Sequence, residues 1–149
     1  MKFLTWNQPL GLPECPYMYR YMLNFGLFSI RLHIWHRSDD KRYLHDHAVD
    51  FVTIVLKGSY TDITRDVVDD TPIGPERGDM MWPGTIRYRK AEHLHCVFEP
   101  VSPTVTLLFC GPKKRNWRFW VQNDTHPDGR WFRPLRFFSR YGHPACDER

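Results

Sequence analysis

A chain of 149 residues has room for one domain, expected to span residues 1–149, and can bury a full core without disulfides. Apolar residues make up 42% of it, which excludes a disordered chain, and no apolar run approaches the ~18 residues of a membrane helix. The net charge is +4, and residues 111–140 carry eight lysines and arginines against only two aspartates. Such a basic segment favours an anionic partner, or serves only to keep the surface solvated.

The chain carries no sign of export or of a metal site built from cysteines. Its N-terminus lacks a sustained apolar core and a small-residue cleavage site, so we expect no signal peptide and a cytoplasmic location. No two cysteines are close in sequence, which disfavours a cysteine metal site. We expect all four to be reduced thiols: Cys15, Cys96, Cys110 and Cys146.

Taken in chain order, the sequence predicts many short strands. Residues 1–24 are aromatic and contain prolines, and within them PYMYRYMLN predicts either a short helix or a strand lying across the barrel. The segment FSIRLHIWHR alternates in the manner of a strand, and DFVTIVLKGSYTDITR predicts two strands around a turn at Gly58. The turn-rich segment TPIGPERGD predicts a loop.

The second half of the chain continues this pattern. A strand broken at Pro83-Gly84 is predicted for MMWPGTIRYRK, and three further strands are predicted for HLHCVFEP, TVTLLFCGP and NWRFWVQN. THPDGRW predicts a turn. At least seven short strands without a long amphipathic helix predict an all-β sandwich or barrel, with its core at about 25–121 and a basic, aromatic segment at 122–149.

Two His-x-His pairs carry the chemistry of this sequence. In a strand, residues i and i+2 point to the same face, so His45 and His47 can both reach one metal ion. His93 and His95 repeat the pattern on a second predicted strand. A small barrel can bring two such strands together around an interior site, and imidazole suits iron, copper, nickel and zinc.

The first pair belongs to a longer motif. HDHAVDFVTIVLKGSYTDI resembles the first motif of the cupin superfamily, in which His-x-His, a short spacer and an apolar strand precede a glycine, here Gly58. Phe51 stands where the usual glutamate ligand would fall. Without that glutamate, the HDH triplet resembles the cysteine-dioxygenase-like branch, whose iron is bound by three histidines. HLHCVFEP and TVTLLFCGP are similar to the second half of that branch's site, with Cys96 where arginine is usual.

This resemblance implies a single cupin-type double-stranded β-helix, or jelly roll, with His45, His47 and His95 as metal ligands and catalytic centre. Fe(II) is the implied metal, with Zn, Ni and Mn as alternatives, and the implied activity is that of a dioxygenase-like non-haem iron oxygenase. The segment GPKKRNWRFW is also similar to small cupin proteins of phage and bacterial genomes. Together these likenesses cover roughly residues 40–120. A cysteine–tyrosine crosslink found in some members of the branch is not expected, because Asp50-Phe51 occupies its place.

Arginines are the expected substrate-binding residues, which makes the substrate small and anionic. The cysteine-dioxygenase-like branch binds a substrate carboxylate through an arginine that precedes the HDH strand, and Arg31 and Arg37 match it by position. Arg87 and Arg89 share one strand face and could clamp a carboxylate or phosphate if that face is interior. If the face is exterior, they are ordinary solvated charges.

Other polar residues near the histidines are expected to support the site. Asp50 is a candidate for orienting a ligand imidazole. His93 is expected at the mouth of the barrel, with a fourth-ligand role and a hydrogen-bonding role both left open. His33 is expected to be a satisfied polar residue, and Asp46 to alternate away from the ligands and bond backbone or a neighbouring strand.

Two other functions remain open from the sequence. A metal-dependent isomerase or lyase would use the same ligands without oxygen. A non-catalytic binding module would hold a metal or small ligand and use the basic segment to contact nucleic acid or a protein partner. We also expect a homodimer that pairs through barrel edges and the aromatic N-terminus, and no membrane association.

Overall fold

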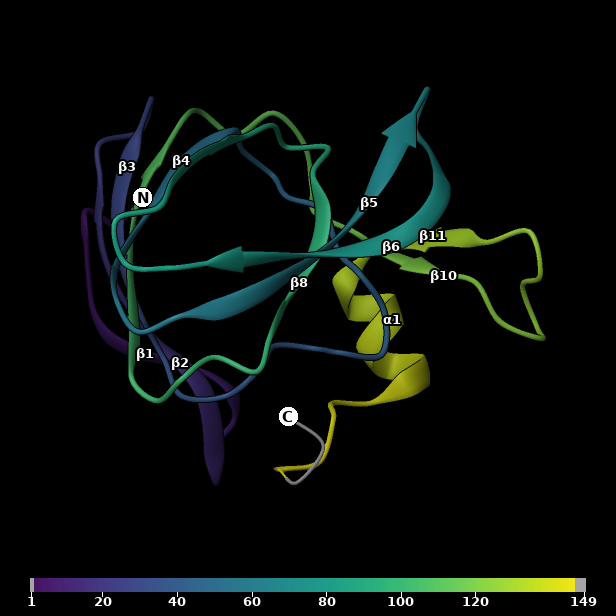
Figure 1. Cartoon of the computed structure of the whole chain (residues 1–149), viewed down its shortest axis with the longest axis horizontal. Helices are drawn as coiled ribbons and strands as arrows, with labels where there is room; N and C mark the ends of the chain where they lie inside the picture. The colour runs from purple at the N-terminus through teal and green to yellow at the C-terminus, as the bar shows by residue number, and fades with distance from the viewer. Residues whose placement is uncertain (1, 147–149) are drawn as a thin grey trace.

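The computed structural model describes residues 2–146, most of which lie in antiparallel strands (Figure 1). The elements in chain order are β1 (Leu4–Leu12), β2 (Cys15–Asn24), β3 (Ser29–Trp35), β4 (Phe51–Lys57), β5 (Tyr60–Val68), β6 (Thr71–Met81), β7 (Ile86–Arg89), β8 (Leu94–Phe98), β9 (Thr104–Cys110), β10 (Phe119–Val121), β11 (Arg130–Phe132) and α1 (Pro134–Tyr141).

A six-stranded sheet forms one wall of the fold, in the order β1-β2-β3-β9-β4-β7. Alternation along its central strands turns every second side chain inward. His33 and Trp35 of β3 pair with Thr106 and Thr104 of β9, and all four side chains are buried. The inner face of this sheet is therefore partly polar, which a pure packing surface would not need.

A three-stranded sheet, in the order β6-β5-β8, lies across from the first. One apolar cluster draws its members from both sheets and joins them: Met18, Trp35, Val55, Tyr60, Met81 and Val97. Two antiparallel sheets around a shared core are the arrangement that the predicted jelly roll requires. The all-β prediction is thereby confirmed, as are the predicted break at Pro83-Gly84 and the strands on either side of Gly58.

The predicted loop at TPIGPERGD is wrong, because these residues lie in β6. This strand pairs with β5 from Tyr60↔Met81 to Val68↔Thr71. It occupies the edge of the three-stranded sheet, where prolines are tolerated because one side of the strand makes no ladder hydrogen bonds. Most of its side chains are exposed, so an edge strand here has the polar, turn-like composition of a loop.

The segment PYMYRYMLN forms a strand and not a short helix, because it lies in β2. β1 and β2 form a hairpin, and β2 pairs with β3 along its length from Met18↔Trp35 to Asn24↔Ser29. The N-terminal segment therefore widens the main sheet. This pairing places the inward side chains of β2 beside those of β3, over the interior of the fold.

The chain after β9 covers one end of the fold. β10 pairs with β11, and α1 packs against them through Phe137, which is fully buried with its ring 3.8 Å from that of Phe119. The sequence predicted no helix here, because eight residues are too few for a clear amphipathic repeat. The predicted strand at NWRFWVQN is shorter than expected and covers only Phe119–Val121. Among the described residues, no helix is long and apolar enough to cross a membrane.

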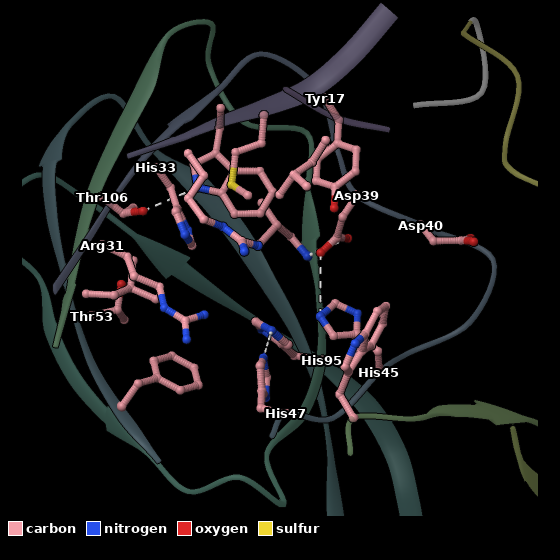
Figure 2. Close-up of a pocket in the computed structure, with 18 of the residues that line it drawn as sticks. Tyr17, Arg31, His33, Asp39, Asp40, His45, His47, Thr53, His95 and Thr106 are labelled. Atoms are coloured by element: carbon pink, nitrogen blue, oxygen red, sulfur yellow. Dashed lines mark hydrogen bonds and ion pairs between the residues drawn. The ribbon is translucent and has the colours of Figure 1, made fainter. Parts of the chain in front are cut away.

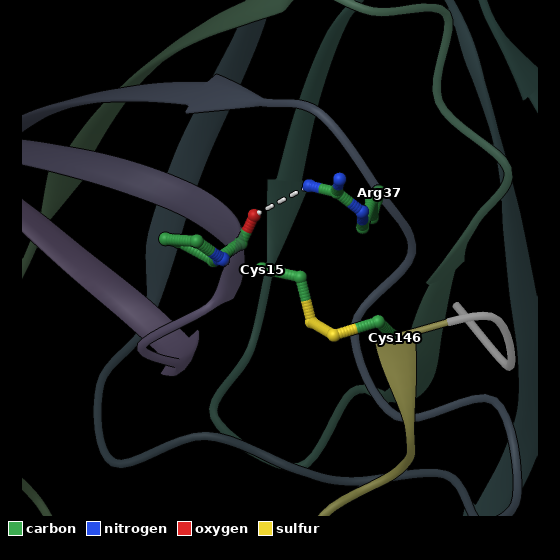
Figure 3. The surroundings of a disulfide bond; sticks show 4 residues. Cys15, Arg37 and Cys146 are labelled. Carbon is green, nitrogen blue, oxygen red and sulfur yellow. Dashed lines mark hydrogen bonds between the residues drawn. A yellow bond between two sulfur atoms is a disulfide. The ribbon is translucent and has the colours of Figure 1, made fainter.

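The expectation that all four cysteines are reduced is wrong for two of them. Cys15 and Cys146 form a disulfide, with their Cα atoms 5.8 Å apart (Figure 3). It ties the start of β2 to the segment that follows α1. The two residues are 131 positions apart, so their proximity depends entirely on the tertiary fold. Cys96 and Cys110 are buried free thiols, as expected.

We expect Cys15→Ser to lower the free energy of unfolding by about 2–5 kcal/mol, because a cross-link over so long a loop restricts the unfolded chain. Urea unfolding with and without dithiothreitol measures this loss. Reductant should bring the wild-type protein down to the stability of the variant and leave the variant unchanged. Equal wild-type midpoints with and without reductant would contradict the prediction.

Candidate metal centre

A cavity of about 450 Å³ lies inside the fold, lined by side chains from both the six-stranded and the three-stranded sheet (Figure 2). A volume of this order suits a small molecule. Five histidines line it: His33, His45, His47, His95 and His143. Three of them, at positions 45, 47 and 95, form a cluster of potential metal ligands.

Backbone hydrogen bonds position the three histidines of the cluster. His45 and His95 exchange two of them, each 2.9 Å from N to O, and the N–H of His47 donates to the carbonyl of Ala91 at 2.9 Å. His95 lies on β8, whereas His45 and His47 lie on an extended segment that belongs to no strand apart from isolated bridges at His45. The predicted HDH strand is therefore wrong in detail, but pairing with β8 still turns both imidazoles toward the cavity.

The spacing of the imidazole nitrogens fits one divalent ion. The potential ligand atoms of the three residues all lie within 4.8 Å of one another, and the Nε2 atoms of His47 and His95 are 2.9 Å apart. Two nitrogens bound at about 2.1 Å from one ion, at a right angle, are about 3 Å apart. His47 and His95 therefore lie as two neighbouring ligands would, with His45 close enough to be the third.

Asp62 on β5 orients His95. Its buried carboxylate accepts a short hydrogen bond from Nδ1 of His95, and its second oxygen lies 3.2 Å from both Nε2 of His93 and Nη2 of Arg89. With its proton on Nδ1, His95 presents Nε2 to the cavity as a ligand atom. Asp62 was not predicted from the sequence. Its signal was alternation, since it shares a strand face with the buried Tyr60 and Thr64.

Burial sets the protonation of these groups. It lowers the pKa of His45 and His47 well below the ordinary value, so both are neutral imidazoles, the form that binds metal. Burial acts on His95 too, but the charge of Asp62 outweighs it and raises the pKa of His95. Burial alone would raise the pKa of Asp62, but the two histidines beside it lower it further, so the group is a carboxylate.

A second buried carboxylate secures the histidine segment from behind. Asp46 accepts hydrogen bonds from the backbone N–H of Arg118 and from the side chains of Arg115 and Arg118, at 2.6–2.8 Å. Arg115 also donates to the carbonyls of His47 and Ala91. Part of the basic segment at 111–140 is therefore internal structure, and its charges balance buried acids.

Of the four arginines expected to bind substrate, Arg31 and Arg89 line the cavity. Arg37 does not, because it donates to the carbonyl of Pro16 (Figure 3). Arg87 does not line it either: its side chain is 41% exposed and lies beside Asp79. Arg37 follows the end of β3, and Arg87 shares a strand face with Arg89 but lies outside the lining of the cavity.

Asp50 was expected to orient a ligand imidazole, but its partners in the structure are different. Its carboxylate accepts the backbone N–H of Ala91 at 2.8 Å and lies 3.2 Å from Nζ of Lys114, and within residues 2–146 it bonds no imidazole. Asp50 therefore braces the turn before β8. His93 lies just ahead of that strand and bonds Asp62, on the side of His95 that faces away from His45.

Asp39 is a further residue that the sequence did not reveal. It follows β3, accepts the backbone N–H of Val97 at 3.0 Å, and places Oδ2 at 3.8 Å from Nε2 of His45 (Figure 2). Burial raises its pKa to about 8. In the sequence it is one of two adjacent aspartates, a pair of the kind that usually lies in solvent, and only the fold shows that it is buried.

Solved structures of other proteins share this fold. Fe(II)-HppE with an alternative substrate aligns with a TM-score of 0.53 and 10% identity over 69% of this chain. A DMSP lyase aligns with a TM-score of 0.51 and 15% identity over 72%. A Klebsiella pneumoniae protein with a double-stranded β-helix domain aligns with a TM-score of 0.52 and 12% identity over 70% of this chain and 85% of its own.

This chain spans only 54% and 56% of the HppE and lyase chains. No protein-family model matches it, and no curated protein is similar to it in sequence. The structural likenesses define the class of fold as the cupin-type double-stranded β-helix that the sequence predicted. A three-histidine cluster lies inside that fold.

We expect His47→Ala to lose most bound metal while the fold survives, because it removes one of three ligands. His93→Ala should lose far less metal than His95→Ala. Elemental analysis of the purified variants measures both, and His126→Ala, a histidine of the loop between β10 and β11, is the matched control. Full occupancy in His47→Ala would contradict the ligand set, and the reverse order of the other two would move the third ligand to His93.

Asp62→Asn should weaken metal binding about 10–100-fold, the usual cost of losing the partner that orients a ligand histidine. Competition with a metal-binding dye measures the affinity. Asp66→Asn is the control on the same strand, because Asp66 is exposed and bonds Arg77. Equal affinities in the two variants would show that Asp62 does not orient the site.

Proposed function

We propose that this protein is a metal-dependent oxygenase that binds Fe(II) through His45, His47 and His95 and oxidises a small anionic substrate. The observation that carries the proposal is the convergence of these three imidazoles on one cavity of small-molecule size. Three imidazole ligands would leave coordination positions open for substrate and oxygen, and iron bound there would supply the redox chemistry. That Fe(II)-HppE shares the fold supports a ferrous site within such a sheet arrangement.

The protein's own residues orient the ligands and limit access of water. Asp62 keeps the proton of His95 on Nδ1, and Asp46 anchors the segment between His45 and His47. Aromatic rings surround the cluster: Phe51 contacts His47 with ring centroids 4.8 Å apart, and Trp117 and Phe119 each lie 5.9 Å from the ring of His45. An apolar surround of this kind strengthens polar interactions inside the cavity.

A metal-dependent lyase is the second candidate, because a DMSP lyase shares the fold and such chemistry uses the same ligands without oxygen. A nucleic-acid-binding module is less well supported by the charges. Arg115 and Arg118 pair with Asp46, and Lys114 pairs with Asp50, so these cations of the basic segment already have partners. The homodimer expected from the exposed aromatic N-terminus stays a prediction.

Protein purified without oxygen should contain iron as its main metal, and exposure to air should change its absorption spectrum as the iron is oxidised. Elemental analysis and spectroscopy before and after exposure measure this. His47→Ala, treated identically, should show neither the iron nor the change. Zinc or nickel with an air-insensitive spectrum would favour the lyase or an isomerase, and absence of bound metal would favour the binding module.

A further inference from the structure

The six-stranded sheet presents a group of basic side chains to the cavity that the metal centre does not use. Arg20 lies on β2, Arg31 and His33 lie on β3, and all three line the cavity. The register places Arg20 directly opposite His33, and Arg31 shares the face of His33 two residues earlier. Three basic groups therefore meet on one patch of the inner face.

No carboxylate neutralises this patch. Within residues 2–146, neither Arg20 nor Arg31 forms an ion pair. Arg89, the third arginine of the cavity, differs because its guanidinium bonds Asp62. The acids that line the cavity all bond other groups: Asp39 bonds Val97, Asp40 bonds Arg42, Asp46 bonds Arg115 and Arg118, and Asp62 bonds His93, His95 and Arg89.

Two nitrogen atoms of the patch also lack hydrogen-bond partners in the part of the chain that the structure describes. They are Nε of Arg20 and Nε2 of His33, both buried, and His33 is only 7% exposed. Buried polar groups without partners are uncommon because each costs the lost hydration. Burial, and then the nearby charge of Arg31, lower the pKa of Arg20. The patch is thus unfavourable by itself and needs an anion to complete it.

We propose that Arg20, Arg31 and His33 bind the anionic group of the substrate, and that this group is a doubly charged oxyanion of the phosphate or phosphonate class. Two guanidinium groups without carboxylate partners match two negative charges, whereas one carboxylate would leave a buried positive charge uncompensated. Guanidinium forks also match the oxygens of a phosphoryl group. The site deepens the proposed function and rests on it, because the same cavity contains the histidine cluster.

One small molecule in the cavity can reach both the basic patch and the histidine cluster. The guanidinium of Arg31 points into the cavity, toward the side where His47 and His95 lie (Figure 2). A substrate bound by its oxyanion on the sheet would therefore extend its other end to the histidines. The basic patch would select the substrate and set the distance of its reacting group from the ligands.

Isothermal titration with inorganic phosphate tests this site in the protein as purified. Arg20→Met and Arg31→Met should each weaken phosphate binding on the order of tenfold or more, because each removes a buried charge partner. Both variants should keep their iron. Arg87→Met is the matched control, an exposed arginine outside the cavity, and it should bind phosphate as the wild type does. Acetate should bind more weakly than phosphate, and the reverse order would overturn the assignment to a dianion.

A second measurement separates lost binding from lost folding. Phosphate should raise the unfolding temperature of the wild type and leave that of Arg20→Met unchanged. Without phosphate, Arg20→Met should unfold at a temperature no lower than the wild type, because it removes an unpaired buried charge. A much lower unfolding temperature without phosphate would show that Arg20 has a structural partner and would overturn the proposal.

The metal-site variant distinguishes this proposal from the proposed function. His47→Ala should lose iron and keep phosphate binding. Phosphate binding that survives in both arginine variants and disappears in His47→Ala would place the anion on the metal and overturn the basic site. Wild-type protein that contains no iron but binds phosphate through Arg20 and Arg31 would support the anion site and contradict the oxygenase.

Discussion

The paired backbone hydrogen bonds between His45 and His95 are the interaction on which the site depends. They join an extended segment that is not part of either sheet to β8, and so bring together two parts of the chain about fifty residues apart. Since the segment is bridged to strands only at His45, it also relies on the carbonyl of Ala91 and the buried carboxylate of Asp46. Arginines from beyond β9 neutralise Asp46, which makes the start of the basic segment part of the site's framework.

The charges around the cavity are divided between its two walls. On the three-stranded sheet, Asp62 balances the histidines beside it and also Arg89, which reaches it from β7 of the six-stranded sheet. On the six-stranded sheet, Arg20 and Arg31 face the cavity with no carboxylate. A protein under selection for stability alone would pair or replace such groups. Unbalanced charge on one wall is instead what a site for an anion requires, at some cost to the stability of the empty protein.

The C-terminal elements β10, β11 and α1 cover one end of the fold, and β10 also contacts the histidine cluster. Phe119 of β10 stacks on Phe137 of α1 and also contacts the ring of His45. The disulfide between Cys15 and Cys146 then ties the segment after α1 to β2, the strand that carries Arg20. Packing at this end therefore reaches both the histidines and the basic patch, although none of these C-terminal residues is a candidate ligand.

The sequence by itself determined what depends on local periodicity. Alternation and apolar runs between turn signals predicted the strands that became β3, β4, β5, β8 and β9. The two His-x-His pairs, with the resemblance to the cupin motifs, predicted His45, His47 and His95, which form a cluster in the structure. The local sequence pattern did not predict β6, because an exposed edge strand has the polar composition of a loop. It did not predict α1, because that helix is too short to show a clear repeat. Tertiary structure alone decided which arginines line the cavity, and it selected Arg31 on β3 over Arg37, which follows the strand and bonds the carbonyl of Pro16. It also decided the partners of Asp62, the pairing of Cys15 with Cys146 and the unpaired state of Arg20, because each depends on residues that are distant in the chain and adjacent only after the sheets have packed.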